Sequence, residues 1–475
     1  MKTIRSRASV ELDVPVFSLT RSRTDRSPEE SARIDDASVI LAAALGAVDP
    51  RSAVRHALSF DPAKDTIEVG GRVYRLEQGG RVVVVGGGKA AAAMALGVLD
   101  VLGDRVDAGE LVVKDGHRGV LDDARIVVHE AAHPWPDERG LSGTRAMMRL
   151  VEGAGPRDLV IVLVSGGGSA LLELLPPEVT LGDLRALTDA LLRSGASIDE
   201  MNVVRKHVSS VKGGQLAARA APARVVALVV SDVVGAPLDV IASGPTVADP
   251  STFVDALEVL RRRELTARVP PPVLAHLERG AVGAVAETPK PGDPRLDPAS
   301  VHNVLVADIA HACDAAHRTA GVLGYESLLL TTFLEGEARE VAKAIASIVK
   351  EVRARRAPCK PPAALLFGGE TTVTLRGSGK GGRNQEFALA AAVALDGVER
   401  VLVVSFATDG TDGPTEAAGG LVTGTTVAEA RARGVDAALH LANNDAYPFL
   451  EAAGGLLVTG PTGTNVCDLI VALVW

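Results

Sequence analysis

The distribution of apolar residues predicts short buried strands that alternate with longer helical segments. Runs of apolar residues at 82–85, 159–164, 225–230, 364–367 and 401–404 are each followed by glycine or serine. Short apolar runs bounded by turn residues are typical of strands that are buried on both faces. Between these runs lie stretches with helical spacing, such as Val341, Ile345, Ile348 and Val352. Because strand and helix alternate along the chain, the pattern predicts an α/β fold.

The first glycine-rich turn follows the valine strand in RVVVVGGGKAAAAMALGVLD, residues 81–100. A strand, a tight glycine turn with Lys89 and a helix start form the usual layout of an α/β phosphate site. The turn fits a loose GxGxxA dinucleotide fingerprint, so a nicotinamide enzyme stays open. It lacks the upstream glycine and the Ser or Thr of a P-loop.

A second turn of this kind occurs in LVIVLVSGGGSALL, residues 159–172, where Ser165 and Ser169 flank three glycines. Neither serine lies in a Gly-x-Ser-x-Gly motif, which excludes a nucleophile elbow. A basic segment with Arg205, Lys206 and Lys212 comes next. It precedes an apolar strand that ends at Asp232, and doubly wound sheets bind their ligands at such strand ends.

The most distinctive stretch is ALLFGGETTVTLRGSGKGGRNQEFALAAAVALDGV, residues 364–398. It predicts a strand at 364–367, a Gly-Gly-Glu turn, a second strand at 371–375 and a helix that begins near Asn384. The intervening glycine loop carries Lys380 and Arg383. A helix N-terminus favours anions, and a guanidinium adds a planar fork that suits phosphate or carboxylate.

Composition narrows the classes of function. The 475 residues predict two or three domains. A formal charge of −9 and only 3% aromatic residues argue against a general nucleic-acid binder. Three dispersed cysteines fit a reducing compartment, taken here as the cytoplasm. No apolar run reaches the roughly 20 residues needed to cross a membrane.

Domain boundaries follow from proline-rich and polar stretches. We expect a disordered tail at 1–36, of which residues 1–30 are dispensable because they are too polar to bury much surface. The expected order then continues with a Rossmann-like α/β domain at 37–285, a proline-rich linker at 286–300 and a second α/β domain at 301–475.

Seven motifs in one order carry a resemblance to a known family. They are GGGKAAAAMA, SGGGSALL, MNVVRKHVSSVKGGQLA, SDVVGAPLDVIASGPT, GGETTV, GKGGRNQEFALA and FATDGTDG. From about residue 37 to its end, the chain resembles the type II glycerate kinases that end in a MOFRL domain. The resemblance implies phosphorylation of D-glycerate by ATP and Mg²⁺, normally at the 2-hydroxyl, in a cleft between two α/β domains.

The family roles fall on Lys89 and Arg383, which we expect to clamp the transferring phosphoryl group. The chain departs from the family at 114–117, where KDGH replaces a Thr-Lys-Tyr-Gly-His type of sequence, so roles for Lys114 and His117 stay open. We expect a small-molecule enzyme that is a monomer or homodimer, without nucleic-acid or membrane partners.

Carboxylates complete the predicted site. Asp232 is the candidate proton acceptor, and the candidate Mg²⁺ ligands are Glu370, Asp409 and Asp412. The positions expected to hold glycerate or ATP phosphates are Gly86, Gly87, Gly88, Ser165, Gly166, Gly167, Gly168, Ser169, Asn202, Arg205, Lys206, Gly381, Gly382 and Asn384. The alternatives are an NAD(P)H-dependent hydroxypyruvate reductase and a non-catalytic metabolite-binding protein.

Overall fold

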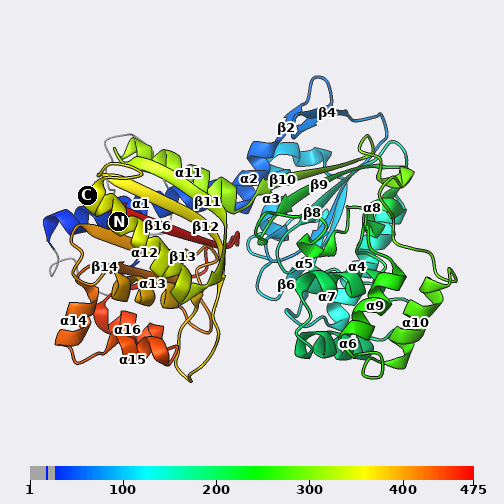
Figure 1. The fold of residues 1–475 in the computed structure, drawn as a ribbon. Helices are drawn as coiled ribbons and strands as arrows, with labels where there is room; N and C mark the ends of the chain where they lie inside the picture. Colours follow the sequence, from blue (N-terminus) through cyan, green and yellow to red (C-terminus); the bar gives the residue numbers. More distant parts are fainter. Residues whose placement is uncertain (1–17, 20–26) are drawn as a thin grey trace. The chain divides into compact units, whose positions relative to one another are not determined.

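The computed structural model describes residues 18, 19 and 27–475, which form two compact units (Figure 1). The central unit is Pro50–Val306. The terminal unit combines Ala307–Trp475 with the described residues up to Asp49. One unit is therefore continuous in sequence, whereas the other is built from both ends of the chain.

The central unit is organised around a six-stranded sheet with the order β10-β9-β8-β5-β6-β7. The pairs β5–β6, β5–β8, β6–β7 and β8–β9 are all parallel. The strands are β5 (Val82–Gly87), β6 (Ala108–Lys114), β7 (Ile126–Ala131), β8 (Leu159–Val164), β9 (Arg224–Val230) and β10 (Val301–Ala307). This sheet confirms the predicted Rossmann-like α/β architecture.

Helices cover both faces of this sheet because alternate strand residues point to opposite sides. Val83, Val85, Val160 and Val162 pack with α4 (Glu138–Glu152) and α8 (Gln215–Ala220), while α3 (Ala91–Leu102) lies on the other face. Shorter helices of this unit are α2 (Pro50–Ala57), α5 (Gly168–Leu171), η2 (Gly103–Arg105), η3 (Ile241–Ser243) and η4 (Pro294–Leu296).

A helical layer extends the central unit beyond the sheet. It comprises α6 (Leu181–Arg193), α7 (Ile198–His207), α9 (Phe253–Arg262) and α10 (Pro271–Ala281), with their own apolar core. Thr180 and Asp183 form a capping box at the start of α6. A small antiparallel sheet, β2 (Leu58–Asp61), β3 (Thr66–Val69) and β4 (Arg72–Arg75), lies near the start of the unit.

The proline-rich segment 286–300, expected to link two domains, lies within the central unit. Thr288 Oγ1 donates a hydrogen bond to Asp249 Oδ2 at 2.9 Å, and the Asp249 N–H donates to the Pro289 carbonyl at 2.8 Å. Asp249 is fully buried. Buried polar contacts therefore fix a segment whose composition suggested an open connection.

The terminal unit contains a mixed sheet whose described strands have the order β1-β15-β14-β13-β16-β12-β11. Only β11 and β12 pair in parallel among the described pairs. The strands are β1 (Ser18–Leu19), β11 (Glu326–Glu337), β12 (Ala363–Thr372), β13 (Val401–Ala407), β14 (Gly419–Thr423), β15 (Leu456–Val458) and β16 (Asp468–Val474).

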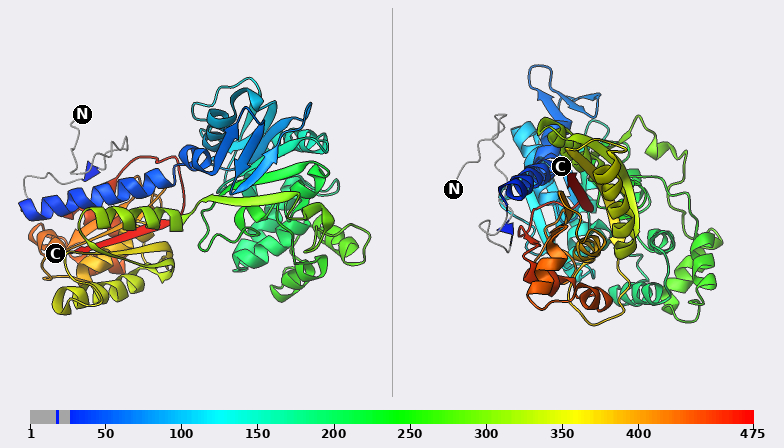
Figure 2. Two further views of the ribbon diagram at one scale, coloured as in Figure 1. Left: turned by 90° about the horizontal axis from the view of Figure 1, so that it is seen from above. Right: turned by 60° about the vertical axis from the view of Figure 1, so that its left-hand side comes forward.

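Helices again cover both faces of this second sheet (Figure 2). Leu365 and Phe367 pack toward α12 (Ala338–Arg355) and α13 (Arg383–Ala394). Gly368, on the opposite face, lies against Ile309 and Cys313 of α11 (Ile309–Val322), which packs beside α1 (Pro28–Ala47). Shorter helices are α14 (Thr426–Ala432), α15 (Ala437–Ala442) and α16 (Ala446–Ala453).

The prediction of a Gly-Gly-Glu turn followed by a new strand at 371–375 is wrong. Strand β12 continues from Ala363 to Thr372 and pairs with β11 as far as Thr372 opposite Glu337. Gly369 is required because β11 is irregular at this point, and a Cβ there would overlap the Leu334 backbone. A glycine that signalled a turn in the sequence therefore allows close strand pairing.

Part of the expected tail is helical. Helix α1 begins at Pro28, capped by the Ser27 hydroxyl, and Ile34 is buried. Arg33 Nη1 donates to the Tyr325 hydroxyl at 2.6 Å, which joins the N-terminal and C-terminal segments of the terminal unit. Residues 1–17 and 20–26 lie outside the described part. Over the described residues, no single helix satisfies the length and hydropathy of a membrane span, although α1 and α2 together do so as a pair bent by 57°.

Candidate active site

The carboxyl ends of the parallel strands gather most of the predicted residues of the central unit. Lys89 follows β5, Ser169 follows β8 and Asp232 follows β9. The Lys89 N–H donates to the Gly166 carbonyl at 2.8 Å, and the Ala90 N–H donates to Ser165 Oγ at 3.1 Å. The two glycine turns are therefore joined to each other by hydrogen bonds.

Close packing explains two of the glycines in these turns. A side chain at Gly88 would overlap Ser165, and one at Gly166 would overlap the Asp232 carboxylate. Asp232 consequently lies against the backbone of the second turn. The turns thus bring the Lys89 backbone and the Asp232 carboxylate to the same segment, 165–168.

A cluster of basic side chains surrounds Lys89. His117 Nδ1 lies 2.9 Å from the Lys89 carbonyl oxygen. Burial and then the positive charges of Lys89, Lys114 and His117 lower the pKa of His133 to about 4. Within residues 18, 19 and 27–475, no hydrogen bond or ion pair engages the Lys89 ammonium. The cluster therefore has a positive charge available for an anion.

A cavity of about 190 Å³ opens beside the second glycine turn. Burial lowers the pKa of Arg205, and the Glu173 carboxylate partly opposes this effect. The fully buried Lys212 donates to the Leu172 carbonyl at 3.1 Å and pairs with Glu173. The lining residues are His133, Pro134, Pro136, Gly167, Ser169, Ala170, Glu173, Leu184, Thr188 and Arg205.

A chain of polar groups reaches Ser169 from α7. Ser243 Oγ donates to Asn202 Oδ1 at 2.9 Å and lies 3.0 Å from Ser169 Oγ. Asn202 is 3% exposed, and its Nδ2 has no hydrogen-bond partner among the described residues. Asn202 and Ser169, both predicted binding residues, are therefore linked through a serine that sequence reasoning missed.

Lys206 lies apart from this cavity, although it was predicted to bind phosphate. Its Nζ is 3.5 Å from Asp249 Oδ1 and 3.6 Å from Asp239 Oδ2, and the side chain is only 5% exposed. Neighbouring positions on a helix point about 100° apart, which separates Lys206 from Arg205. The structure thus places Lys206 in the buried network that fixes segment 286–300.

In the terminal unit, Arg383 is paired on all sides. Its Nε and Nη2 donate to Asp468 at 2.6 and 2.9 Å, and its Nη1 contacts Glu370 at 2.6 Å. Asp468 is buried at the start of β16, and burial raises its pKa, while Arg383 opposes the shift. Sequence reasoning missed Asp468, although an acid that opens an otherwise apolar strand was the available signal.

The N-terminus of α13 also has a partner within the protein. Asp412 accepts hydrogen bonds from the Asn384 and Gln385 N–H groups at 3.2 and 2.9 Å. Burial raises the pKa of Asp412 to about 6, opposed by these two N–H groups. The glycine at 382 lets this carboxylate approach, since a Cβ there would overlap it. Asp412 therefore occupies the anion-binding position that the sequence suggested for a ligand.

The remaining predicted residues of this unit have local roles. Asp409 Oδ1 accepts from the Thr411 N–H at 3.0 Å, and the Asn384 side chain accepts from Ser405 Oγ at 2.6 Å. Gly381 packs beside Ala446. Among the described residues, no group of three His, Cys, Asp or Glu side chains is arranged to hold a metal.

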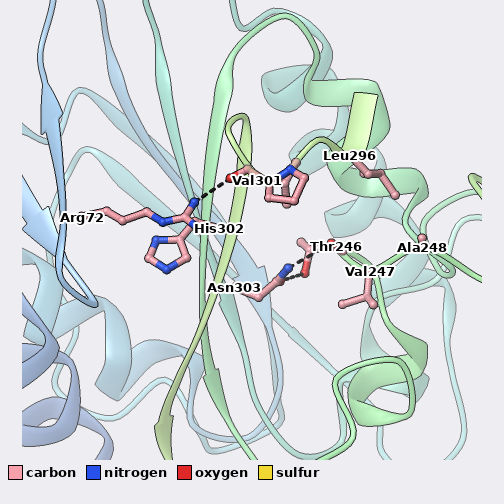
Figure 3. A pocket seen from close by; sticks show the side chains of 9 residues that line it. Arg72, Thr246, Val247, Ala248, Leu296, Val301, His302 and Asn303 are labelled. Atoms are coloured by element: carbon pink, nitrogen blue, oxygen red, sulfur yellow. Dashed lines mark hydrogen bonds between the residues drawn. The ribbon is translucent and has the colours of Figure 1, made fainter. Parts of the chain in front are cut away.

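A larger cavity of about 320 Å³ lies elsewhere in the central unit (Figure 3). Arg72 Nη1 donates to the Pro298 carbonyl at 2.6 Å, and Thr246 Oγ1 donates to Asn303 Oδ1 at 2.6 Å. His302 Nδ1 lies 2.9 Å from the Tyr74 hydroxyl. These polar groups satisfy one another, whereas the smaller cavity contains an arginine with no such partner. The smaller cavity is therefore the better candidate for an anionic ligand.

Comparison with known proteins gives matches over most of the chain. Residues 36–278 match a family described as a domain of unknown function, DUF4147, and residues 363–468 match the MOFRL family. A protein named glycerate 2-kinase from Pyrococcus horikoshii is 46% identical over 432 residues, which cover 91% of this chain and 95% of the relative.

Two further relatives bear on function. A crystal structure of a glycerate kinase from Thermotoga maritima superposes with a TM-score of 0.83 at 44% identity, covering 94% of this chain and 100% of that one. A protein named putative hydroxypyruvate reductase from Agrobacterium vitis is 42% identical over 438 residues, covering 92% of this chain and 93% of the relative.

Proposed function

Since this chain belongs to the glycerate 2-kinase family that carries the DUF4147 and MOFRL segments, we propose that it transfers the γ-phosphoryl group of ATP to the 2-hydroxyl of D-glycerate. The observation that carries the proposal is the pair of cations beside the second glycine turn, Lys89 and Arg205, neither of which has a side-chain hydrogen bond or ion pair among the described residues. Both substrates of a glycerate kinase are anions, so they would neutralise these charges.

Lys89 is assigned to the transferring phosphoryl group. Phosphoryl transfer depends mainly on alignment and on neutralised charge, because little covalent chemistry is asked of the protein. An ammonium beside a glycine turn and the N-terminus of α3 meets this need. Asp232, which lies against the second turn, is assigned as the acceptor of the substrate hydroxyl proton.

Arg383 is assigned to the same reaction, in accordance with the family resemblance. Its guanidinium is held by Asp468 and Glu370. Arg383 would therefore contact the phosphoryl group only after Glu370 releases Nη1. Alternatively, it would hold the Asp468 and Glu370 carboxylates in position beside the nucleotide. We propose that Lys89 and Arg383 both act in this reaction, so that their mutational effects on turnover are not additive.

The residues of the terminal unit fit a magnesium ion that is held largely by the nucleotide. Mg²⁺ commonly keeps several waters and takes only one or two protein carboxylates together with substrate phosphates. Burial is the main cause of the raised pKa of Asp412 and of Asp468, and a neighbouring carboxylate adds to it in each case, Asp468 for Asp412 and Asp409 for Asp468. Glu370, Asp409 and Asp412 remain the candidate ligands, and the ion would neutralise phosphate charge.

The hydroxypyruvate reductase alternative has less support. In a dinucleotide fold the glycines leave room for the pyrophosphate. Here a Cβ at Gly86 would overlap the backbone of β8, and a Cβ at Gly88 would overlap Ser165. The space beside these two glycines is therefore filled by the protein itself. The name of the Agrobacterium relative keeps this alternative in the test. We further propose that the enzyme is a monomer or homodimer in the reducing cytoplasm, a compartment that fits its three buried cysteines.

One pair of assays tests the function. The purified protein should consume ATP only when D-glycerate and Mg²⁺ are both present. Coupling to enolase without phosphoglycerate mutase should then yield phosphoenolpyruvate, which requires 2-phosphoglycerate. NADH-dependent reduction of hydroxypyruvate without kinase activity would refute the proposal, and ligand binding without turnover would indicate a metabolite-binding protein.

A further inference from the structure

The Arg205 guanidinium is the unsatisfied group of the 190 Å³ cavity. It lines that cavity, and no side-chain hydrogen bond or ion pair to it exists within the described residues. An arginine without a partner in a half-buried place is costly for folding. Its retention is explained if a ligand anion supplies the missing partner, since the planar fork matches a carboxylate.

The hydroxyl of Ser169 faces the same cavity in a defined orientation. Ser243 Oγ gives its single proton to Asn202 Oδ1. In the 3.0 Å contact between the two serines, Ser169 must therefore be the donor. Its proton points to Ser243, and its lone pairs remain available. Toward a ligand Ser169 is thus an acceptor, which suits an alcohol group and would repel a carboxylate.

The charge and size of the cavity limit the ligand further. Arg205 and Glu173 line the cavity, and Glu173 is already paired with the buried Lys212, so the positive charge of Arg205 is the one left for a ligand. His133 is neutral near pH 7 because burial lowers its pKa to about 4. Drug-sized ligands need about 300–1,000 Å³, so about 190 Å³ suits an acid of three or four carbons.

We propose that this cavity is the subsite that recognises the substrate as a short hydroxy acid, with Arg205 binding the carboxylate and Ser169 accepting a hydrogen bond from the hydroxyl on C3. The inference rests on the proposed function for the identity of the acid. If the 2-hydroxyl is the phosphoryl acceptor, the C3 hydroxyl is the one left for Ser169. Ser243 and Asn202 are positioning residues that fix the direction of the Ser169 proton.

The test compares three ligands that differ by one group. D-Glycerate has every group, D-lactate lacks the C3 hydroxyl, and D-glyceramide replaces the carboxylate by a neutral amide. Dissociation constants by ligand-observed NMR and kcat/KM for D-glycerate are measured on wild type, Arg205→Gln and Ser169→Ala. Arg193→Gln is the matched control, because this arginine is exposed on α6 and pairs with Asp189.

Arg205→Gln should weaken the binding of D-glycerate about 100-fold and hardly change the binding of D-glyceramide, because a charge-assisted hydrogen bond is lost only for the acid. Ser169→Ala should weaken the binding of D-glycerate about tenfold and leave the binding of D-lactate unchanged. Arg193→Gln should match wild type. Equal losses for the acid and the amide, or for glycerate and lactate, would overturn the assignment.

Stability and binding separate this inference from its alternatives. Arg205→Gln should melt at or above the wild-type temperature, because it removes an unpaired cation. A fall of many degrees would mark Arg205 as structural and overturn the proposal. If wild type binds D-glycerate through Arg205 but does not phosphorylate it, the proposed function fails and the subsite stands. If D-glycerate does not bind at all, the subsite fails as well.

Discussion

Replacing Arg383 by alanine should destabilise the terminal unit, although Arg383 lies at the end of a glycine loop. Two of its nitrogens bind Asp468, which is 4% exposed, and a third binds Glu370. Removing one partner of a buried ion pair typically costs about 3–5 kcal/mol. Because the Arg383 side chain is one-third exposed, water offsets part of this loss, and we expect about 3 kcal/mol.

The loss should appear in both thermal and urea unfolding. For a folding unit of about 200 residues, about 3 kcal/mol corresponds to a fall in Tm of about 6–12 °C. The cost should be larger at pH 8 than at pH 5. The folded-state pKa of Asp468 lies above its ordinary value, so the native state takes up a proton as the pH falls and the unpaired charge disappears.

A double-mutant cycle with Asp468→Asn isolates the pair. Asp468→Asn removes the charge that Arg383 compensates, so the double variant should be less destabilised than the two single losses combined, with a coupling of about 2 kcal/mol. Lys380→Ala is the control in the same loop. Lys380 is half exposed and contacts Glu416 at 3.8 Å, so less than about 1 kcal/mol is expected. A wild-type Tm for Arg383→Ala, or zero coupling, would refute this reasoning.

Three further predictions follow from the site and from the first helix. Lys89→Ala should lower kcat about 100- to 1,000-fold without changing Tm. In the coupled assay, the double variant with Arg383→Ala should lose far less kcat than the product of the two single losses. For His133→Gln, the free energy of unfolding in urea should fall less between pH 7 and pH 5 than it does for wild type, by about 1 kcal/mol. A neutral buried histidine stabilises the fold above pH 6.5, and this stabilisation is lost toward its pKa of about 4. Deleting residues 1–17 should leave Tm and turnover unchanged, whereas deleting 1–36 should lower Tm because it removes part of α1; equal effects of both deletions would contradict this.

Local sequence patterns predicted several strands of the two sheets. The valine run at 82–85 and the apolar run at 159–164 are strands of the central sheet, and Lys89 and Asp232 follow strand ends as expected. Such runs are informative because strands buried on both faces need apolar residues at every position. The glycines of β12 led to a wrong prediction of a turn. Glycine occurs both in turns and where strands approach closely, and a single sequence does not distinguish the two.

Side-chain pairing could not be predicted from the sequence. Arg205 and Lys206 are adjacent and both basic, yet one lines the cavity and the other pairs with Asp249, which is 43 positions away. Asp468 and Asp412 come from loops and strands that only the fold brings to Arg383. Whether a cation is available to a ligand depends on such distant partners, and the spacing of residues along the chain does not reveal which of them are in contact.

The two-segment construction of the terminal unit has a consequence for synthesis on the ribosome. Helix α1 ends at Ala47, but α11, its main packing partner, begins only at Ile309, about 260 residues later. At about 5–20 residues per second, the apolar side of α1 would wait about 13–50 s for that partner. The continuous stretch from Pro50 to Val306 can meanwhile complete its own core. Nascent chains should therefore expose an unpaired apolar helix for most of translation, and a chaperone that binds such helices would act on this protein before its last strand has emerged.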